Sequence, residues 1–287
     1  MRTRAAIRGS PTPLTTLWSI STTPTCRWVR WRGEPAVGSP AAVVQRAKAH
    51  TVRIGTWNTW WANPRGARGD RVRTVLADPG CDILCVTEGS AGLLPTGGHI
   101  IDAGTEWGYS PRDKDRRKVL LWSRSPWSEE DCVGSPDFPG GRFVKGVAET
   151  AIGKMTVVGV CIPWDGAHVG SGRKDRRRWQ DHLAWLETFE RLPWRRTTPR
   201  MVVLGDFNQR IPRTRAPGKA FETLLRAFDG LAIATAGVPE ARIDHIAHTP
   251  DLTHASPIGT WPKRDAEAHA LSDHVGVWAD FGLAPTT

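Results

Sequence analysis

The sequence lacks any long hydrophobic run. No uncharged stretch of its 287 residues approaches the ~18 apolar residues that a membrane-spanning helix needs. Cysteine is also scarce: five are scattered along the chain, an odd count, and none forms a CxxC pair. This usage predicts reduced thiols, and therefore a cytoplasmic protein, rather than a disulfide framework. Residues 51–287 contain no repeat and no low-complexity segment.

Acidic residues are nearly absent from the first 50 positions, where eight Lys and Arg face a single acid, Glu34. The net charge of +10 is therefore uneven, with +7 in residues 1–50 and +3 in residues 51–287. The first 50 residues show no sustained periodicity, which predicts a disordered basic extension rather than a targeting peptide. The remainder is only mildly basic, so overall charge is a poor argument for nucleic-acid binding.

Hydrophobic residues make up 39% of the chain and include 15 tryptophans. This content indicates a globular core and excludes disorder of the whole chain. The roughly 237 residues that follow the extension are enough for one large domain or two small ones. We expect a folded domain over residues 51–283.

Apolar runs in this part of the chain predict more strands than helices. Helices are expected over 69–77, over 174–190 and over 220–228, where apolar residues recur at helical spacing. Two runs that flank Gly153-Lys154 predict a hairpin. The pattern indicates two packed sheets with helices outside, an α/β fold. The expected strands are 52–54, 82–88, 119–122, 143–150, 155–161, 201–205, 242–247 and 275–281.

Polar residues that chemistry can use lie at the ends of these strands. A strand end exposes its side chain at the rim of a sheet while the backbone stays rigid, so a precise site is easiest to build there. The residues concerned are Asn58, Glu88, Asp206, Asn208, Asp244, Asp273 and His274.

Three of these residues offer hard oxygen ligands and no thiolate. Asn58, Glu88 and Asp273 suit Mg²⁺, with Mn²⁺ or Ca²⁺ as alternatives and Zn²⁺ less favoured. Mg²⁺ usually takes one or two carboxylates and keeps several waters, so three scattered oxygens suffice.

The other four residues suit phosphoester chemistry. Asp206 can accept a proton from an attacking water, and Asn208 can donate to a phosphate oxygen. A protonated His274 can stabilise charge that develops on phosphorus, and Asp244 can hold its imidazole. Each has an ordinary alternative, since a lone Asp-His is more often a satisfied surface pair. The combination, in this order and beside strands, predicts metal-assisted phosphoester hydrolysis.

The chain resembles the DNase I-like endonuclease/exonuclease/phosphatase superfamily. Short motifs in the same order carry this resemblance, and together they span residues 52–281. They are IGTWN (54–58), DILCVTE (82–88), VLLWSRSP (119–126), VVLGDFN (202–208), RIDHI (242–246) and LSDH (271–274).

The resemblance implies a four-layer α/β sandwich with two packed mixed sheets flanked by helices. It makes residues 51–283 the catalytic domain of a divalent-metal phosphoesterase. By motif, Asn58 and Glu88 bind the metal with Asp273 close to it. Asp206 positions or deprotonates water, Asn208 contacts the phosphate, and Asp244 and His274 form a carboxylate–imidazole pair.

One departure from the superfamily pattern concerns the strand that ends at Cys161. Many relatives carry a His here, and the exonuclease III-like branch carries a Tyr before a Pro, whereas this chain has Cys161-Ile162-Pro163. A thiol is a weak donor and does not replace a phenol or an imidazolium well. His168 either reaches the site in its place or, as we favour, lies on a surface loop.

Two basic clusters, 112–118 and 173–178, lie beside the predicted site residues in the sequence. Arginines suit bidentate phosphate contacts, so Arg117 and Arg173 are predicted to bind substrate. Trp164 is predicted to join them, because its ring can stack on a base. The alternatives are a solvated charged surface and, for Trp164, a place in the core.

Three functions agree with these features. The first is a Mg²⁺- or Mn²⁺-dependent nuclease or related phosphodiesterase. The second is a phosphomonoesterase or an inositol or sphingolipid phosphodiesterase of the same fold, and the third is a catalytically silent binding module. The motifs recognise only the phosphoryl group. Because of the arginine clusters, we expect a phosphoester substrate such as nucleic acid.

Overall fold

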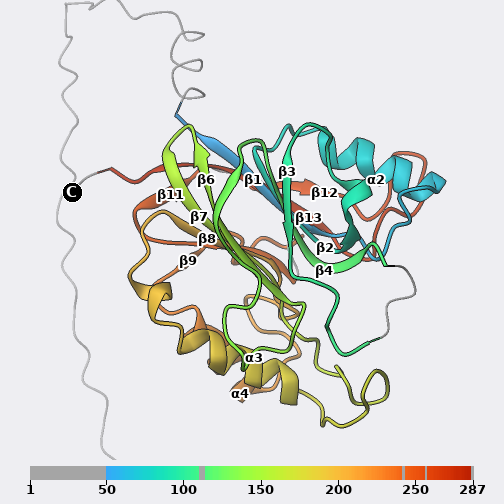
Figure 1. Cartoon of the computed structure of the whole chain (residues 1–287), viewed down its shortest axis with the longest axis vertical. Coiled ribbons are helices and arrows are strands. Elements are labelled where there is room, and N and C mark those ends of the chain that lie inside the picture. Colours follow the sequence, from blue (N-terminus) through green and yellow to red (C-terminus); the bar gives the residue numbers. More distant parts are fainter. Residues whose placement is uncertain (1–49, 110–113, 241–242, 256, 286–287) are drawn as a thin grey trace, which may run out of the picture. The chain divides into compact units, whose positions relative to one another are not determined.

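The computed structural model describes residues 50–109, 114–240, 243–255 and 257–285 (Figure 1). The predicted disordered extension over residues 1–50 lies outside these ranges, apart from His50. Arg112 and Arg242 lie outside them as well. Within the described ranges, no helix combines the length and the apolar character needed to cross a membrane.

Thirteen strands of the described residues form two sheets. The first sheet has the order β11-β13-β1-β2-β4-β3, with β12 also paired to β13, and the second has the order β5-β6-β7-β8-β10-β9. Both sheets are mixed, since β1 pairs with β2 and β7 with β8 in parallel while the other pairs are antiparallel. The strands of the first sheet are β1 (Val52–Asn58), β2 (Ile83–Ser90), β3 (His99–Asp102), β4 (Arg116–Ser123), β11 (Leu252–His254), β12 (Gly259–Trp261) and β13 (Gly276–Leu283). Those of the second are β5 (Trp127–Asp131), β6 (Phe143–Thr150), β7 (Gly153–Cys161), β8 (Met201–Asp206), β9 (Ala232–Ile233) and β10 (Asp244–His248).

The two sheets pack face to face, and helices cover their outer faces (Figure 1). One core cluster fills the space between the sheets, with residues from both, such as Val119 and Val157. The helix α2 (Ala67–Ala77) packs on the first sheet, and α3 (Gln180–Glu190) and α4 (Gly218–Ala227) pack on the second. This arrangement confirms the predicted α/β sandwich of two packed mixed sheets.

The central strands are mostly buried and largely apolar because both of their faces are covered. All six residues of β8 are buried, and so are the last five of the seven residues of β1, from Ile54 onward. A strand covered on both faces has no solvent face to alternate with. Asn58 and Asp206 stand at the ends of these two strands, at the rim of each sheet.

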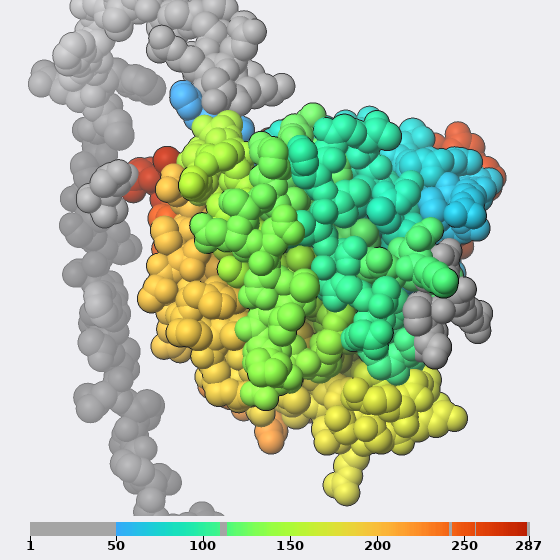
Figure 2. All heavy atoms as spheres, in the orientation of Figure 1, coloured from blue at the N-terminus to red at the C-terminus, as the bar shows by residue number. Residues whose placement is uncertain are grey.

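The helix predicted over 174–190 is wrong in its first six residues, because α3 begins at Gln180. Trp179, just before it, has a left-handed backbone (φ 68°), and its N–H donates to the Asp165 carbonyl at 2.6 Å. The segment between β7 and α3 thus bonds to itself instead of extending the helix. It forms part of the yellow projection beside α3 in Figure 2. The helix buries Trp185, Leu186 and Phe189.

Five strands were not predicted, and each lacks a long apolar run. The strands β3 and β5 lie at sheet edges and expose most of their residues. The strands β9, β11 and β12 have only two or three residues. Their pairing comes from neighbouring strands, which a single-sequence pattern does not reveal.

Gly205, in β8, gives a test of how closely the strands that carry the site approach each other. Its φ is +143°, and a Cβ there would stand 1.9 Å from the carbonyl oxygen of Val160 in β7. We expect Gly205→Ala to lower the free energy of unfolding by more than ~2 kcal/mol, because backbone rather than a side chain must move. Gly170→Ala, at an exposed glycine with no atom within 4 Å, is the matched control and should be near neutral in urea unfolding. Equal stability of the two variants would contradict this account.

His182, on α3, gives a second test, through pH. Its Nδ1 donates to the Pro163 carbonyl at 2.6 Å, so its Nε2, 2.6 Å from the side-chain nitrogen of Gln209, accepts. Burial lowers the pKa of His182 to about 4 from an ordinary 6.5. The unfolded chain therefore binds a proton first as the pH falls, and stability is lost between about pH 6.5 and 4.

Between pH 7.5 and pH 5, the free energy of unfolding of the wild type, measured in urea, should fall by about 2 kcal/mol more than that of His182→Gln. The comparison between the two chains removes the contribution of other titrating groups. If the free energy of unfolding falls equally with pH in the two chains, His182 does not cause the loss of stability.

Candidate active site

A hollow of about 370 Å³ opens where the central strands of the two sheets end. Every residue predicted to bind metal lines it, and so do Asp206, Asn208, His274 and Trp164. Asp244 lies buried beneath them. The complete lining is Asn58, Trp60, Trp61, Glu88, Lys118, Arg142, Cys161, Trp164, Asp206, Asn208, Asp273 and His274.

Strand direction explains this convergence. The parallel pair β1 and β2 brings Asn58 and Glu88 to one edge of the first sheet. The parallel pair β7 and β8 brings Cys161 opposite Asp206 at the corresponding edge of the second sheet. The strand β10 starts with Asp244 paired to Asp206. Carboxyl ends of parallel strands thus meet at the junction of the two sheets.

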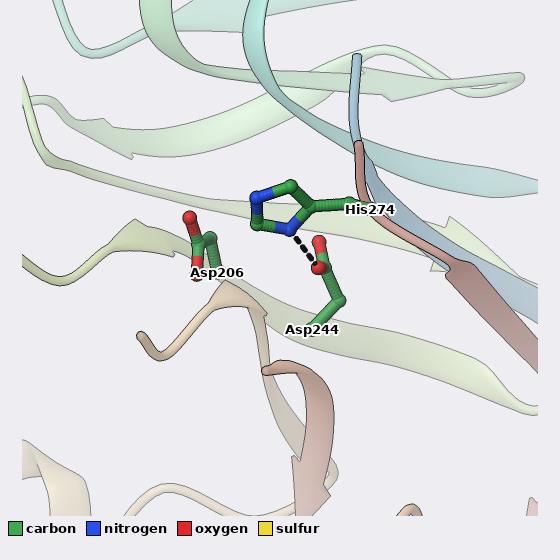
Figure 3. Close-up of side chains that lie close together, drawn as sticks. All are labelled: Asp206, Asp244 and His274. Carbon is green, nitrogen blue, oxygen red and sulfur yellow. Dashed lines mark hydrogen bonds and ion pairs between the residues drawn. The ribbon is translucent and has the colours of Figure 1, made fainter. Parts of the chain in front are cut away.

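His274 and Asp244 form a short contact at the site, 2.5 Å from Nδ1 to Oδ2 (Figure 3). The figure shows the imidazole between the Asp244 and Asp206 carboxylates. Burial alone would lower the pKa of His274, but Asp244 and the other carboxylates around the ring raise it to about 10. His274 is therefore an imidazolium at neutral pH, with Nε2 directed away from Asp244.

Asp206 is 2% exposed, and both of its carboxylate oxygens are held. The Asn58 side-chain amide donates to Oδ2 at 3.1 Å, and the Asn208 backbone N–H donates to Oδ1 at 2.9 Å. Burial and the nearby Asp244 and Glu88 carboxylates raise the pKa of Asp206 to about 7, against the opposing charge of His274. The carboxylate therefore has one fixed orientation in the hollow.

Ser272 connects the two chain segments that supply Asn58 and His274. Its hydroxyl donates to the Asn58 carbonyl at 2.6 Å and accepts from the His274 N–H at 3.0 Å. The indole of Trp57 also donates to the His274 carbonyl, at 3.1 Å. The sequence analysis did not single out Ser272, although it stands inside the LSDH motif.

Trp60 and Trp61 in the lining have left-handed backbones, and so do two of the predicted site residues, Glu88 (φ 49°) and Asn208 (φ 53°). This conformation is uncommon for residues other than glycine, and it breaks the alternation of side chains along a strand. Both side chains turn into the hollow. Asn208 is fixed there by donating from its side-chain amide to the Ile162 carbonyl at 2.8 Å.

The donors present fit a divalent cation with a preference for oxygen. Asn58 Oδ1 accepts one N–H, from Trp60 at 2.9 Å, and an amide oxygen has a second lone pair. Glu88 uses Oε1 for Lys118, at 2.5 Å, so Oε2 can face a cation. Cys161 also lines the hollow, but burial raises the pKa of its thiol to about 12, so it offers no thiolate to a softer metal.

Arg142 was missed by the sequence analysis. It is 1% exposed and lines the hollow, and its Nε and Nη2 have no hydrogen-bond partner among the described residues. Its Nη1 donates to the Cys161 carbonyl at 3.3 Å and lies 3.9 Å from the Cys161 sulfur. The sequence did contain a signal for the position of Arg142. In the predicted hairpin around Gly153, Phe143 pairs with Val160, so the next pair along places Arg142 opposite Cys161.

Arg117 and Arg173, predicted to bind substrate, do not line the hollow. Arg117 pairs with Asp102 at 2.9 Å, and Arg173 lies 3.4 Å from Asp175. Among the described residues of the first basic cluster, Lys118 lines the hollow. Its Nζ lies 5.1 Å from the centre of the Trp61 ring. The second cluster precedes α3 instead of beginning a helix.

His168 neither reaches the site nor lies on the surface. It is 1% exposed, with Nδ1 2.6 Å from Asp181 and Nε2 3.2 Å from the Trp107 carbonyl. The ring stacks on Tyr109. Both expectations for this residue are therefore wrong, because its two nitrogens fasten the segment before α3 to the body of the protein.

Residues 55–274 match the profile of the Endonuclease/Exonuclease/phosphatase family. Among solved structures, an AP endonuclease from Archaeoglobus fulgidus has 20% identity and a TM-score of 0.57, covering 79% of this chain and 98% of that one. A 3'-5' exonuclease from Neisseria meningitidis has 21% identity and a TM-score of 0.55, covering 80% and 99%. An endonuclease/exonuclease/phosphatase from Beutenbergia cavernae has 18% identity and a TM-score of 0.56, covering 82% and 72%.

No curated protein sequence matches the chain. The solved structures show the shared fold, and the profile covers well over half of the chain, from the first strand to His274. Members of this family hydrolyse phosphoester bonds. The chain belongs to the Endonuclease/Exonuclease/phosphatase family.

Proposed function

We propose that this protein is a Mg²⁺-dependent phosphodiesterase, most simply a nuclease, with Mn²⁺ as the alternative cation and residues 51–283 as the catalytic domain. One observation carries the proposal: His274, paired to Asp244, faces Asp206 across the hollow that Asn58 and Glu88 also line. A base and a fixed positive charge on either side of one small space suit a phosphoryl group.

The residues divide the chemistry as their contacts allow. Asp206, held by two N–H donors, takes a proton from the attacking water. Asn208 uses one amide hydrogen on Ile162 and has the second for a phosphate oxygen. His274, fixed by Asp244, stabilises the negative charge that develops on the phosphoryl oxygens.

Asn58, Glu88 and Asp273 would hold the divalent cation, since their oxygens line the same hollow. When bound, such a cation polarises the phosphoryl oxygen and offsets its charge. The carboxylates and the amide oxygen also argue against a catalytically silent module, because each is retained at the hollow. The unpaired thiols among the described cysteines agree with a reducing, cytoplasmic location.

Arg142 supplies positive charge at the position where Cys161 replaces the His or Tyr of the superfamily pattern. Where relatives carry a His or a Tyr, this chain has a thiol that donates weakly. The guanidinium of Arg142 lies directly behind it, buried and with two nitrogens that no described residue contacts by a hydrogen bond. We propose that its charge, poorly screened at this depth, stabilises the anionic phosphoryl group from behind Cys161.

Activity tests the proposal directly. With Mg²⁺ or Mn²⁺, the full-length chain should hydrolyse bis(p-nitrophenyl) phosphate or DNA, and EDTA should stop the reaction. Asp206→Asn and His274→Gln should each lower kcat by ~10²-fold or more. His269→Gln is the matched control, because His269 pairs with Asp265 in an exposed Asp–His contact outside the hollow. Full turnover in the Asp206 and His274 variants would defeat the assignment.

A second comparison isolates Arg142. Arg142→Met should lower kcat by about 10²-fold, on the scale of removing one charge-stabilising group. Arg195→Met is the control, since Arg195 is equally buried, also has Nε and Nη2 without a hydrogen bond to the described residues, and lies outside the hollow. Both substitutions change stability, so unfolding midpoints are measured beside kcat. An equal effect on kcat in the two variants would refute a role for Arg142 in turnover.

A further inference from the structure

A second hollow, of about 410 Å³, adjoins the candidate active site. Trp164 and Asn208 line both hollows, so the two lie side by side. Its walls come from residues 164–165 and 178–179 on one side and from residues 208–217 on the other. We call this hollow the side groove. Its volume suits a group about as large as one nucleoside.

The side groove carries unneutralised positive charge. Arg178 is occupied by an ion pair with Asp165. Within the described part of the chain, Arg210 and Arg215 form no ion pair, although both line the groove. Two arginines without carboxylate partners at the rim of a phosphoesterase site favour a second anionic group of the substrate.

Trp164 gives the groove an aromatic wall. The residue is 45% exposed, which is uncommon for so large an apolar side chain. The ring lies against the backbone of Gly166, where a Cβ would stand 2.4 Å from it. Part of the indole is therefore supported by the protein, and its exposed part is available for stacking.

The two walls are tied together at the point where the hollows meet. Asn208, on one wall, donates to the Ile162 carbonyl, two residues before Trp164 on the other. Gln209 is 2% exposed and donates to the Ala220 carbonyl at 3.0 Å. The Asn208 contact ties the backbone that leads to Trp164 to the arginine-bearing wall, and the Gln209 contact anchors that wall.

We infer that the side groove binds the nucleotide next to the scissile phosphate of a polynucleotide strand. The base stacks on Trp164, and the following phosphate contacts Arg210 and Arg215. An inositol phosphate would use the arginines but has no aromatic ring to stack on the indole, and a lipid chain would be poorly matched to a cationic wall. This inference rests on the proposed phosphodiesterase function and gives its substrate class.

Binding without hydrolysis tests the groove separately from catalysis. Fluorescence anisotropy measures the affinity of the full-length chain for an oligothymidylate of eight nucleotides and for an abasic phosphodiester of equal length. EDTA is present to remove divalent cations and prevent hydrolysis. The wild type should bind the oligothymidylate more tightly, and Trp164→Ala should weaken that binding by about tenfold while leaving the abasic strand unchanged. Trp164→Phe should restore most of the affinity.

The arginines give the complementary result. The double variant Arg210→Ala, Arg215→Ala should weaken the binding of both strands, and the dependence of log affinity on log salt should flatten by about 0.7 for each phosphate that is no longer neutralised. Arg191→Ala is the control, since it removes an exposed charge outside the groove. Circular dichroism confirms that each variant is folded.

Two outcomes overturn the inference: equal wild-type affinity for the two strands, or a weakening by Trp164→Ala that is the same for both. Hydrolysis of methyl p-nitrophenyl phosphate with Mg²⁺ is measured in parallel on the wild type. Absence of that hydrolysis in the wild type would count against the proposed function, whereas the binding comparison would still decide the groove.

Discussion

The two oxygens of one buried carboxylate join the sheets at the place where the site forms. Asp244, at the start of β10 in the second sheet, accepts from the Asn58 backbone through Oδ1 at 3.0 Å and from His274 through Oδ2 at 2.5 Å. Both partners belong to segments of the first sheet. A buried charge is tolerated only when its partners are well placed, so this carboxylate fixes the relative position of the two sheets. The chemistry depends on that position.

Much of the site could be predicted from the sequence because strand ends are marked locally. A covered strand is apolar until it reaches the rim, so the first polar residue after the run shows where the rim is. Asn58, Asp206 and Asn208 were found in this way, and they line one hollow. The order of the motifs supplied the rest, since no local pattern brings Glu88 and His274 together across the chain.

What escaped prediction depends on contacts between distant segments. Arg142 looks like an ordinary arginine at the start of a strand, and its place behind Cys161 follows only from cross-strand register. The predicted start of α3 failed because Trp179 bonds to Asp165 in preference to continuing the helix. Arg117 was chosen for its charge, but Asp102 already neutralises it. Tertiary partners, not local propensity, decided each case.

The segment between β7 and α3 is held by contacts of its own. His168 binds Asp181, Asp181 binds Arg176 at 2.7 Å, and the chain re-enters regular structure at Gln180. Only Trp164, near its start, reaches the hollow that holds the carboxylates. Replacing this segment as a unit would therefore reshape the approach to the hollow, while the carboxylates on the strands keep their places.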